Sequence, residues 1–196
     1  MVRNYQDRPV AEDALERVAQ SALRAPSAGN SQAIGVVVVT DRDKRHKIAR
    51  LANEQSYVDA GFDPWISRAP AHVVISVSRQ VYIDRYSEPD KLGPNGETID
   101  WPIPYWWIDA GASLMAVLLT TVDEGLSAGF LGVHSVPDLA SCLNLPEDHT
   151  PIGVITVGHG ATDRRSSSLD RPSKQRSAVI HHNQWSQTSA SGGSIR

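Results

Sequence analysis

Cysteine is nearly absent from this sequence, and its scarcity limits the chemistry open to the protein. Cys142 is the only cysteine among the 196 residues, so neither an internal disulfide nor a cysteine-rich metal site can form. It stands in a stretch, residues 138–143, that reads as a short helix, where a small buried apolar residue is expected rather than a nucleophile. A single thiol is typical of proteins in a reducing compartment.

The sequence also lacks an excess of basic residues. It has 19 lysines and arginines against 22 aspartates and glutamates, a formal net charge of −3. Proteins that bind nucleic acid or anionic membranes usually carry basic excess, so neither partner is expected. The first residues are polar, without the apolar run of a signal peptide, and the apolar stretches at 36–39 and 114–119 are too short to span a bilayer. We therefore expect a cytoplasmic protein.

Several motifs that carry chemistry are missing as well. There is no Gly-x-Gly-x-x-Gly or Walker A sequence, so neither a Rossmann nor a P-loop nucleotide site is supported. There is no Gly-x-Ser-x-Gly elbow of a serine hydrolase. The seven histidines are scattered apart from the pair His181-His182, without metal-binding spacing. No metal site is expected, and no catalytic side chain can be named.

The patterns that are present predict one mixed α+β domain, with a central mixed or antiparallel sheet flanked by helices. Apolar residues recur at helical spacing over 12–24, and Asp41 is a good N-cap for a second helix over 42–55. We expect strands or extended segments at 34–40, 71–78, 127–133 and 151–159, a long helix over 108–124 that ends at Gly125, and a short helix over 136–143.

Three further segments carry expectations about packing. The β-branched run at 34–39 favours a strand covered on both faces. The helix at 108–124 is apolar nearly all round, so it should be buried on most sides, most economically in a dimer. Residues 86–105 contain four prolines and two glycines and read as a long excursion. We expect one domain over 1–185 and a disordered tail over 186–196, which has almost no large apolar side chains.

Three groups of residues could bind a ligand, and each has a plainer explanation. The polar segment 26–32 offers hydroxyls, carboxamides and backbone groups to the edge of a planar ring, but Ser, Gly and Asn also simply make turns. The aromatic residues of segment 101–107 suit either a stacking pocket or the core. The late basic residues could meet a phosphate or form a solvated tail; they are Arg164, Arg165, Arg171, Lys174 and Arg176.

Taken in order, these segments resemble the nitroreductase family of flavoproteins over nearly the whole chain. Arg3-Asn-Tyr-Gln-Asp-Arg-Pro-Val is similar to the family's opening, and Ala25-Pro-Ser-Ala-Gly-Asn-Ser-Gln to its Ala-Pro-Ser-x-x-Asn-x-Gln signature. The segment from Asp109 is similar to its long central helix, and Gly125-Leu-Ser-Ala-Gly-Phe-Leu-Gly to the stretch that passes the flavin. The resemblance implies a nitroreductase-like fold and an intertwined homodimer with FMN at the interface.

The resemblance also implies roles for individual residues. Arg3 matches the basic residue at flavin N1 and O2, and Leu131 and Gly132 match the backbone facing N5. Ser27, Ala28, Asn30 and Gln32 match residues around the ring and ribityl chain, and Arg171 with Lys174 match the basic pair on the phosphate. Trp101, Tyr105 and Trp106 are candidates for the acceptor pocket.

The implied function is that of an oxidoreductase that passes a hydride from NAD(P)H through FMN to nitroaromatics, quinones or similar acceptors. Family members usually carry a basic Arg-Arg-Ser element before the opening arginine, whereas Met1-Val2 stand here. Either the natural chain starts earlier or the phosphate is held less tightly, and weak retention of FMN is the expected consequence. The alternatives are a relative that binds a deazaflavin or modifies flavin, and a non-catalytic protein that binds or stores flavin.

Overall fold

Four antiparallel strands form one sheet, and the computed structural model describes it together with the rest of residues 1–175 and 178–185. The strands are β1 (Ile34–Val39), β2 (Ala71–Ser78), β3 (Ser127–Gly132) and β4 (His149–Gly158), in the order β1-β2-β4-β3. Ile34 lies opposite Val77, Ala71 opposite Val157, and Ser127 opposite Gly158. The predicted α+β class is confirmed, and all four segments expected to be extended form strands.

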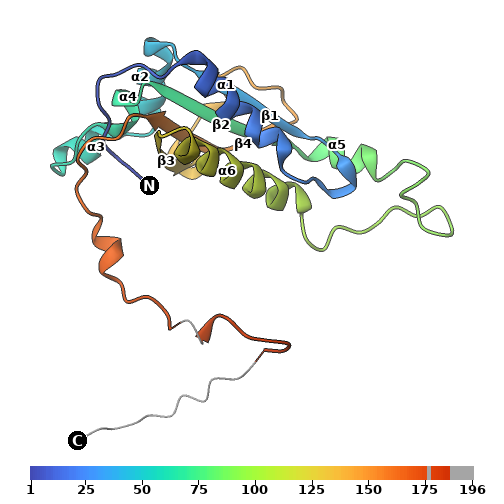
Figure 1. The fold of residues 1–196 in the computed structure, drawn as a ribbon. Coiled ribbons are helices and arrows are strands. Elements are labelled where there is room, and N and C mark those ends of the chain that lie inside the picture. Colours follow the sequence, from blue (N-terminus) through green and yellow to red (C-terminus); the bar gives the residue numbers. More distant parts are fainter. Residues whose placement is uncertain (176–177, 186–196) are drawn as a thin grey trace, which may run out of the picture. The chain divides into compact units, whose positions relative to one another are not determined.

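Helices cover both faces of the sheet (Figure 1). Val73 and Ile75 of β2 point to one face, where α1 (Glu12–Ser21) and α6 (Tyr105–Asp123) pack side by side. Val74 points to the other face, which is covered by α2 (Arg42–Leu51), α4 (Trp65–Arg68) and α7 (Leu139–Cys142). This alternation follows from the two-residue period of a strand and places one apolar core on each side.

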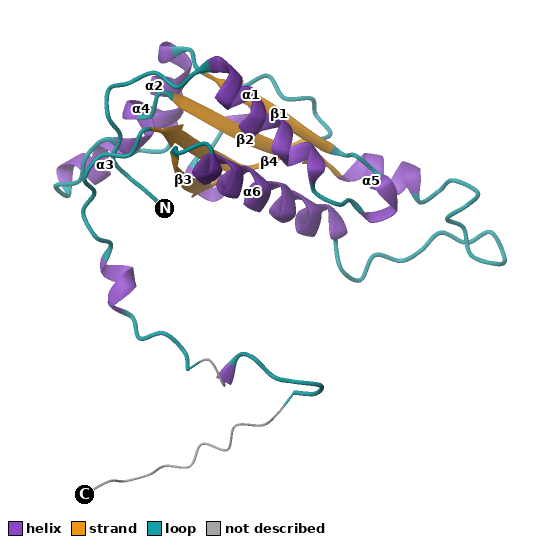
Figure 2. Cartoon of the chain, viewed as in Figure 1, coloured by secondary structure: helices purple, strands orange, loops and turns teal. Residues whose placement is uncertain are grey.

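Several predicted elements have different limits in the structure (Figure 2). The first helix continues as the 3₁₀ turn η1 (Ala22–Arg24), as expected for 12–24. The helix expected over 42–55 ends at Leu51, because Asn53 takes a left-handed conformation (φ 51°) before α3 (Glu54–Asp59) begins. Asp41 caps α2 as predicted, with its carboxylate accepting from the N–H of Lys44 at 2.8 Å. Helix α5 (Arg79–Arg85) was not predicted.

Two expectations about burial are met only in part within a single chain. β1 is covered on both faces only in part: Val36 packs against one core and Val37 and Val39 against the other, while Val38 is exposed. Helix α6 buries one face only, while apolar side chains on the opposite face are exposed: Ile108, Met115, Leu119 and Val122. By length and composition alone, α6 could cross a membrane, as many core helices could. The expectation that no apolar stretch is long enough to span a bilayer is therefore wrong for α6. In this structure α6 packs against the sheet.

The chain divides into two compact units, residues 1–163 and 164–196. The first contains all the elements above, and the second contains the 3₁₀ turn η4 (Ser167–Asp170) among its described residues. Cys142 is a buried free cysteine, as expected. A single domain over 1–185 stays a prediction, and the tail expected over 186–196 lies outside the described residues.

Candidate functional site

The loop of residues 27–32 lines a cavity of about 390 Å³ on the side of the sheet that carries α1 and α6. Ser27, Asn30 and Gln32 of the loop share this cavity with Ile34 of β1 and Ser113 of α6. A cavity of this size lies within the range of sites that bind small molecules. Three of the four loop residues that the sequence singled out are therefore brought together around one space.

The loop takes a turn that few sequences allow. Gly29, Asn30 and Gln32 all have positive φ, at 61°, 55° and 52°. Glycine adopts this region freely, and asparagine more readily than most residues. Gly29 is also required by space, because a Cβ at this position would lie 2.7 Å from the ring of Tyr86. Gly29 is therefore required both by the turn and by the close approach of the Tyr86 ring.

A buried carboxylate of α6 holds the start of the loop. Asp109, which is 7% exposed, accepts hydrogen bonds from the N–H of Ala28 at 2.8 Å and from the hydroxyl of Tyr82 at 2.7 Å. Hydrogen bonds to a charged acceptor are the stronger kind, so this pair fixes the loop to both α6 and α5. Burial, reinforced by the hydrogen bond to Asp109, raises the pKa of Tyr82 well above its ordinary value.

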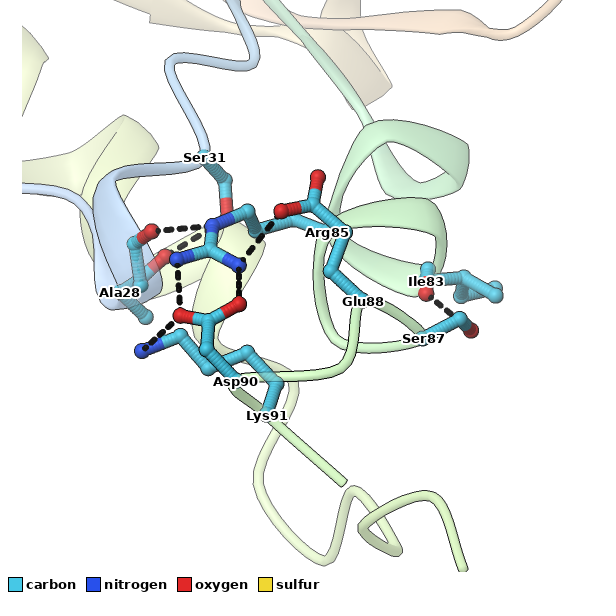
Figure 3. Close-up of polar contacts among 9 residues, drawn as sticks. Ala28, Ser31, Ile83, Arg85, Ser87, Glu88, Asp90 and Lys91 are labelled. Atoms are coloured by element: carbon cyan, nitrogen blue, oxygen red, sulfur yellow. Dashed lines mark hydrogen bonds and ion pairs between the residues drawn. The ribbon is translucent and has the colours of Figure 1, made fainter. Parts of the chain in front are cut away.

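Arg85 at the end of α5 ties the loop to the excursion that follows (Figure 3). Its Nε donates to the carbonyl of Gly29 at 2.9 Å, while Nη1 and Nη2 grip the Asp90 carboxylate at 2.7 and 2.8 Å. Nη1 also donates to Glu88 at 2.8 Å. The guanidinium lowers the pKa of Asp90 to about 2. One side chain thus joins the 27–32 loop to the chain that leads into residues 86–104.

The second group of predicted residues lies along the outer edge of β3. The N–H of Val2 donates to the carbonyl of Ala128 at 2.9 Å, which places Arg3 beside this strand. The guanidinium of Arg3 lies 5.9 Å from the ring centroid of Trp65. The side chain of Leu131 is buried in the core, so only its backbone and that of Gly132 could face a ligand.

Two further features mark this edge. Gly129 lets the N-terminal segment approach, because a Cβ there would lie 2.7 Å from the carbonyl oxygen of Val2 and 2.9 Å from Trp65. The indole nitrogen of Trp65 is buried and has no hydrogen-bond partner within the described residues. An unpartnered buried donor is uncommon and costs stability, and this one belongs to the indole that lies beside Arg3.

Arg3 and the 27–32 loop lie at opposite ends of the sheet within one chain, whereas Gly132 lies opposite Gly153 nearer the middle. The N–H of Ser78, at the end of β2, donates to Ala33 directly after the 27–32 loop. Ala71, at the start of β2, lies opposite Val157, and Val157 lies opposite Ala128 beside Arg3. The length of a strand of this size is on the order of 20 Å. A single chain therefore does not bring Arg3 to the 27–32 loop.

The aromatic residues predicted for an acceptor pocket pack mainly on one another. Trp101 meets Trp106, Tyr105 and Tyr86 edge-on, with centroid distances of 5.7, 6.2 and 4.7 Å. Trp106 is buried, whereas Tyr105 is 44% exposed. Trp106 thus belongs to a small core beside the 27–32 loop, and Tyr105 is the member of the three that faces outward.

Arg171 and Lys174 belong to the second unit, where both are exposed and Arg171 directly follows η4. Their assignment to a phosphate stays a prediction. Sequence reasoning missed Asp109, Tyr82 and Arg85. The lone acid in the apolar stretch at 108–119 was a signal for Asp109, whereas nothing in the sequence pointed to Arg85.

Comparison with known proteins gives a consistent result along the chain. A model described as Nitroreductase family matches residues 1–159. "FMN reductase [NAD(P)H]" of Bacillus subtilis (strain 168) is 27% identical over 199 residues, covering 92% of this chain and 68% of that protein. "NADPH-flavin oxidoreductase" of Vibrio harveyi is 23% identical, covering 94% and 70%.

Solved structures of similar proteins agree with the family match. The structure of B. megaterium NfrA2 superposes with a TM-score of 0.71 at 25% identity, covering 95% of this chain and 72% of that one. NADPH:FMN oxidoreductase from Vibrio harveyi, complexed with NAD+, gives a TM-score of 0.69 at 20% identity, covering 95% and 74%. The second match bears on the fold alone.

Proposed function

The chain belongs to the nitroreductase family, and we propose that it is an FMN-dependent oxidoreductase that passes a hydride from NAD(P)H to nitroaromatic, quinone or similar acceptors. The observation that carries this proposal is the cavity of about 390 Å³ lined by the 27–32 loop, which bears the family's signature. Relatives named as an FMN reductase and an NADPH-flavin oxidoreductase support the cofactor and the donor. Bound FMN would accept and release the hydride at N5.

The residues around the cavity suit the polar edge of a flavin. Ser27, Asn30 and Gln32 offer a hydroxyl and two carboxamides, which can both donate and accept. Ala28 contributes differently, because its N–H is bound by Asp109 and its carbonyl accepts from Ser31 at 2.6 Å. We assign to Ala28 contact with the ligand and the positioning of its neighbours, rather than hydrogen bonds to the ligand.

The edge of β3 supplies the complementary part. A cation at Arg3 would stabilise negative charge at N1 and O2 of the reduced ring. The backbone of Leu131 and Gly132 would face N5. Arg171 and Lys174 would bind the phosphate through charge-assisted hydrogen bonds. Tyr105, with Trp101 beside it, would face the acceptor.

A second copy of the chain would bring Arg3 and a 27–32 loop together. The exposed face of α6 carries Ile108, Met115, Leu119 and Val122, which are 50%, 52%, 60% and 66% exposed. Their spacing of seven, four and three residues forms one stripe along the helix. Apolar patches of this kind mark protein interfaces. We assign the α6 stripe to a homodimer in which each site combines Arg3 of one protomer with the 27–32 loop of its partner.

Replacement of Leu119 by lysine tests the dimer. The charge would have to be buried without a partner, so the variant should sediment as a monomer while the wild type sediments as a dimer. Val58→Lys, at an exposed apolar residue of α3, which contacts α2 and α4 on the other side of the sheet from α6, is the matched control and should leave the dimer intact. A dimeric Leu119→Lys protein would remove α6 from the interface.

The activity is tested by adding FMN to the purified protein, removing excess, and recording the visible spectrum before and after NADH or NADPH under anaerobic conditions. Bleaching of bound flavin by one nucleotide supports the reductase and names its donor. Bound flavin that neither nucleotide bleaches would favour flavin storage or another chemistry, and a protein that binds no FMN even with the excess restored would contradict the proposal. A cytoplasmic location is part of the same proposal.

A further inference from the structure

A cluster of basic residues around a second cavity lies away from the 27–32 loop, at the end of the sheet where β1 stops. A cleft of about 640 Å³ opens between the segment after Tyr5, the start of α2, and α4. Four arginines and one histidine line it, and we call it the cationic cleft: Arg8, Arg42, Arg45, His46 and Arg68. Asp7 is the only acidic residue in its lining.

The positive charge of the cationic cleft is largely unpaired. Across residues 1–175 and 178–185, no ion pair joins Arg8, Arg42 or Arg45 to a carboxylate. Arg68 is the exception, with Asp63 at 3.0 Å. Three guanidinium groups that form no ion pair among the described residues gather around one cavity, in a chain whose formal net charge is −3. Like charges held together repel one another, so such a cluster favours a bound anion.

The centre of the cleft is held in place by backbone contacts. Arg45 donates from Nη1 to the carbonyls of Ser67 and Ala69 and from Nε to Thr40. Nη2 has no partner in the part of the chain that the structure describes. Burial, together with the charge of Arg42, lowers the pKa of Arg45. Arg45 is thus a positioned donor rather than a mobile surface group.

His46 is oriented in the same way. Its Nδ1 lies 2.7 Å from the carbonyl oxygen of Arg42, one turn earlier in α2, which leaves Nε2 for another partner. Arg8, in the segment after Tyr5, and Arg42, at the start of α2, are exposed and could bind a ligand in the cleft. Guanidinium groups bind phosphate through paired N–H bonds, and several of them around one volume suit a group with two negative charges.

We propose that the cationic cleft binds a phosphorylated small molecule, with Arg8, Arg42 and Arg45 as its phosphate ligands. The volume lies within the range of small-molecule sites and exceeds that of a single phosphate, so the ligand carries an organic part as well. Its phosphate could belong to the 2′-position of NADPH or to a separate phosphorylated compound. The inference is independent of the proposed flavin chemistry, since none of these residues lines the cavity at the 27–32 loop.

Pyrophosphate is the probe for the first measurement, by calorimetric titration of the full chain without FMN. The double variant Arg8→Gln/Arg42→Gln should weaken binding on the order of tenfold or more. Lys47→Gln/Arg50→Gln removes the same net charge from exposed positions that do not line the cleft, and should bind like the wild type. Wild-type protein that binds no pyrophosphate, or equal weakening in both double variants, would overturn the proposal.

The two sources of the phosphate are separated in the FMN-loaded enzyme. If NADPH supplies it, Arg8→Gln/Arg42→Gln raises the KM for NADPH and leaves that for NADH unchanged, and pyrophosphate competes with NADPH. If a separate compound supplies it, both KM values stay unchanged although pyrophosphate binding is lost. An enzyme without reductase activity would contradict the proposed function only, because the titration needs no flavin.

Discussion

Asp109 is the residue on which the shape of the 27–32 loop most depends. Asp109→Ala removes the acceptor for both Ala28 and Tyr82, and an unpaired buried donor costs about 1–3 kcal/mol. We expect FMN affinity to fall about tenfold or more, because the loop would no longer be fixed. Tyr82→Phe leaves the bond to Ala28 and should cause a smaller loss. Fluorescence titration with FMN measures both, and equal affinity in all three proteins would contradict this role.

A second residue, His72, contributes to the response of the fold to acid. His72 in β2 is fully buried, with Nε2 at 2.8 Å from the carbonyl oxygen of Ile66 and Nδ1 without a partner within the described residues. Burial lowers its pKa from 6.5 to about 4. The unfolded chain therefore takes up a proton near pH 6.5, while the folded chain stays neutral until about pH 4.

The sign of the resulting effect is definite. Between these two pKa values the unfolded state holds more protons, so the free energy of unfolding falls as the pH falls from about 6.5 to about 4, by on the order of 3 kcal/mol. Urea denaturation at several pH values measures the slope. His72→Gln cannot titrate and should have a shallower slope over this range. A slope unchanged by the substitution would assign the acid sensitivity to other groups.

At the scale of elements, Arg85 couples α5, the 27–32 loop and the excursion over 86–104. Arg85→Gln removes the bond to Gly29 and the ion pairs to Asp90 and Glu88 together. We expect faster tryptic cleavage at Lys91 and weaker FMN binding. Asp90→Asn weakens the tie to the excursion and keeps the bond to Gly29, so cleavage should accelerate with FMN affinity unchanged. If cleavage in Arg85→Gln matches the wild type, Arg85 does not restrain the excursion.

The elements that the sequence predicted are those with a strong local signal. Asp41 marks the start of α2, and stretches rich in β-branched apolar residues mark β1 and β2. Helix α5 and the short α4 were missed, because α5 carries no apolar stripe beyond Val81, Tyr82 and Ile83, and α4 has only four residues. The break at Asn53 depends on one left-handed residue, which periodicity does not reveal. Local sequence patterns therefore predict the strands, whereas the short connecting helices depend on tertiary contacts that local patterns do not reveal.

At the scale of the molecule, the sequence predicted one binding site from residues that lie far from one another within a single chain. Family motifs placed Arg3 and the 27–32 loop in one site, but motifs carry no distances between distant segments. The register of the sheet supplies them, with Ala33 at one end of β2 and Ala128 two strands away at the other end. The exposed stripe on α6 gives this separation a physical explanation, because a second copy packed there would close both sites at once.

Mixed dimers provide a test of such shared sites. Arg3→Gln damages one part of the site, and Asn30→Gly removes a carboxamide from the other part while allowing the positive φ of 55°. Each homodimer should be weak in FMN-dependent NAD(P)H oxidation. After unfolding, mixing and refolding, half of the dimers should be mixed, and each should hold one intact site, which restores roughly a quarter of the wild-type rate.

The same mixture distinguishes a shared site from a site within one chain. If Arg3 and Asn30 acted in one protomer, every site in the mixed dimer would keep one damaged residue, and the rate would equal the average of the two variants. Leu119→Lys in both chains should abolish the recovery, since the α6 stripe could no longer hold the protomers together. Recovery that survives this substitution would separate the shared site from the α6 interface and require another surface to join the two copies.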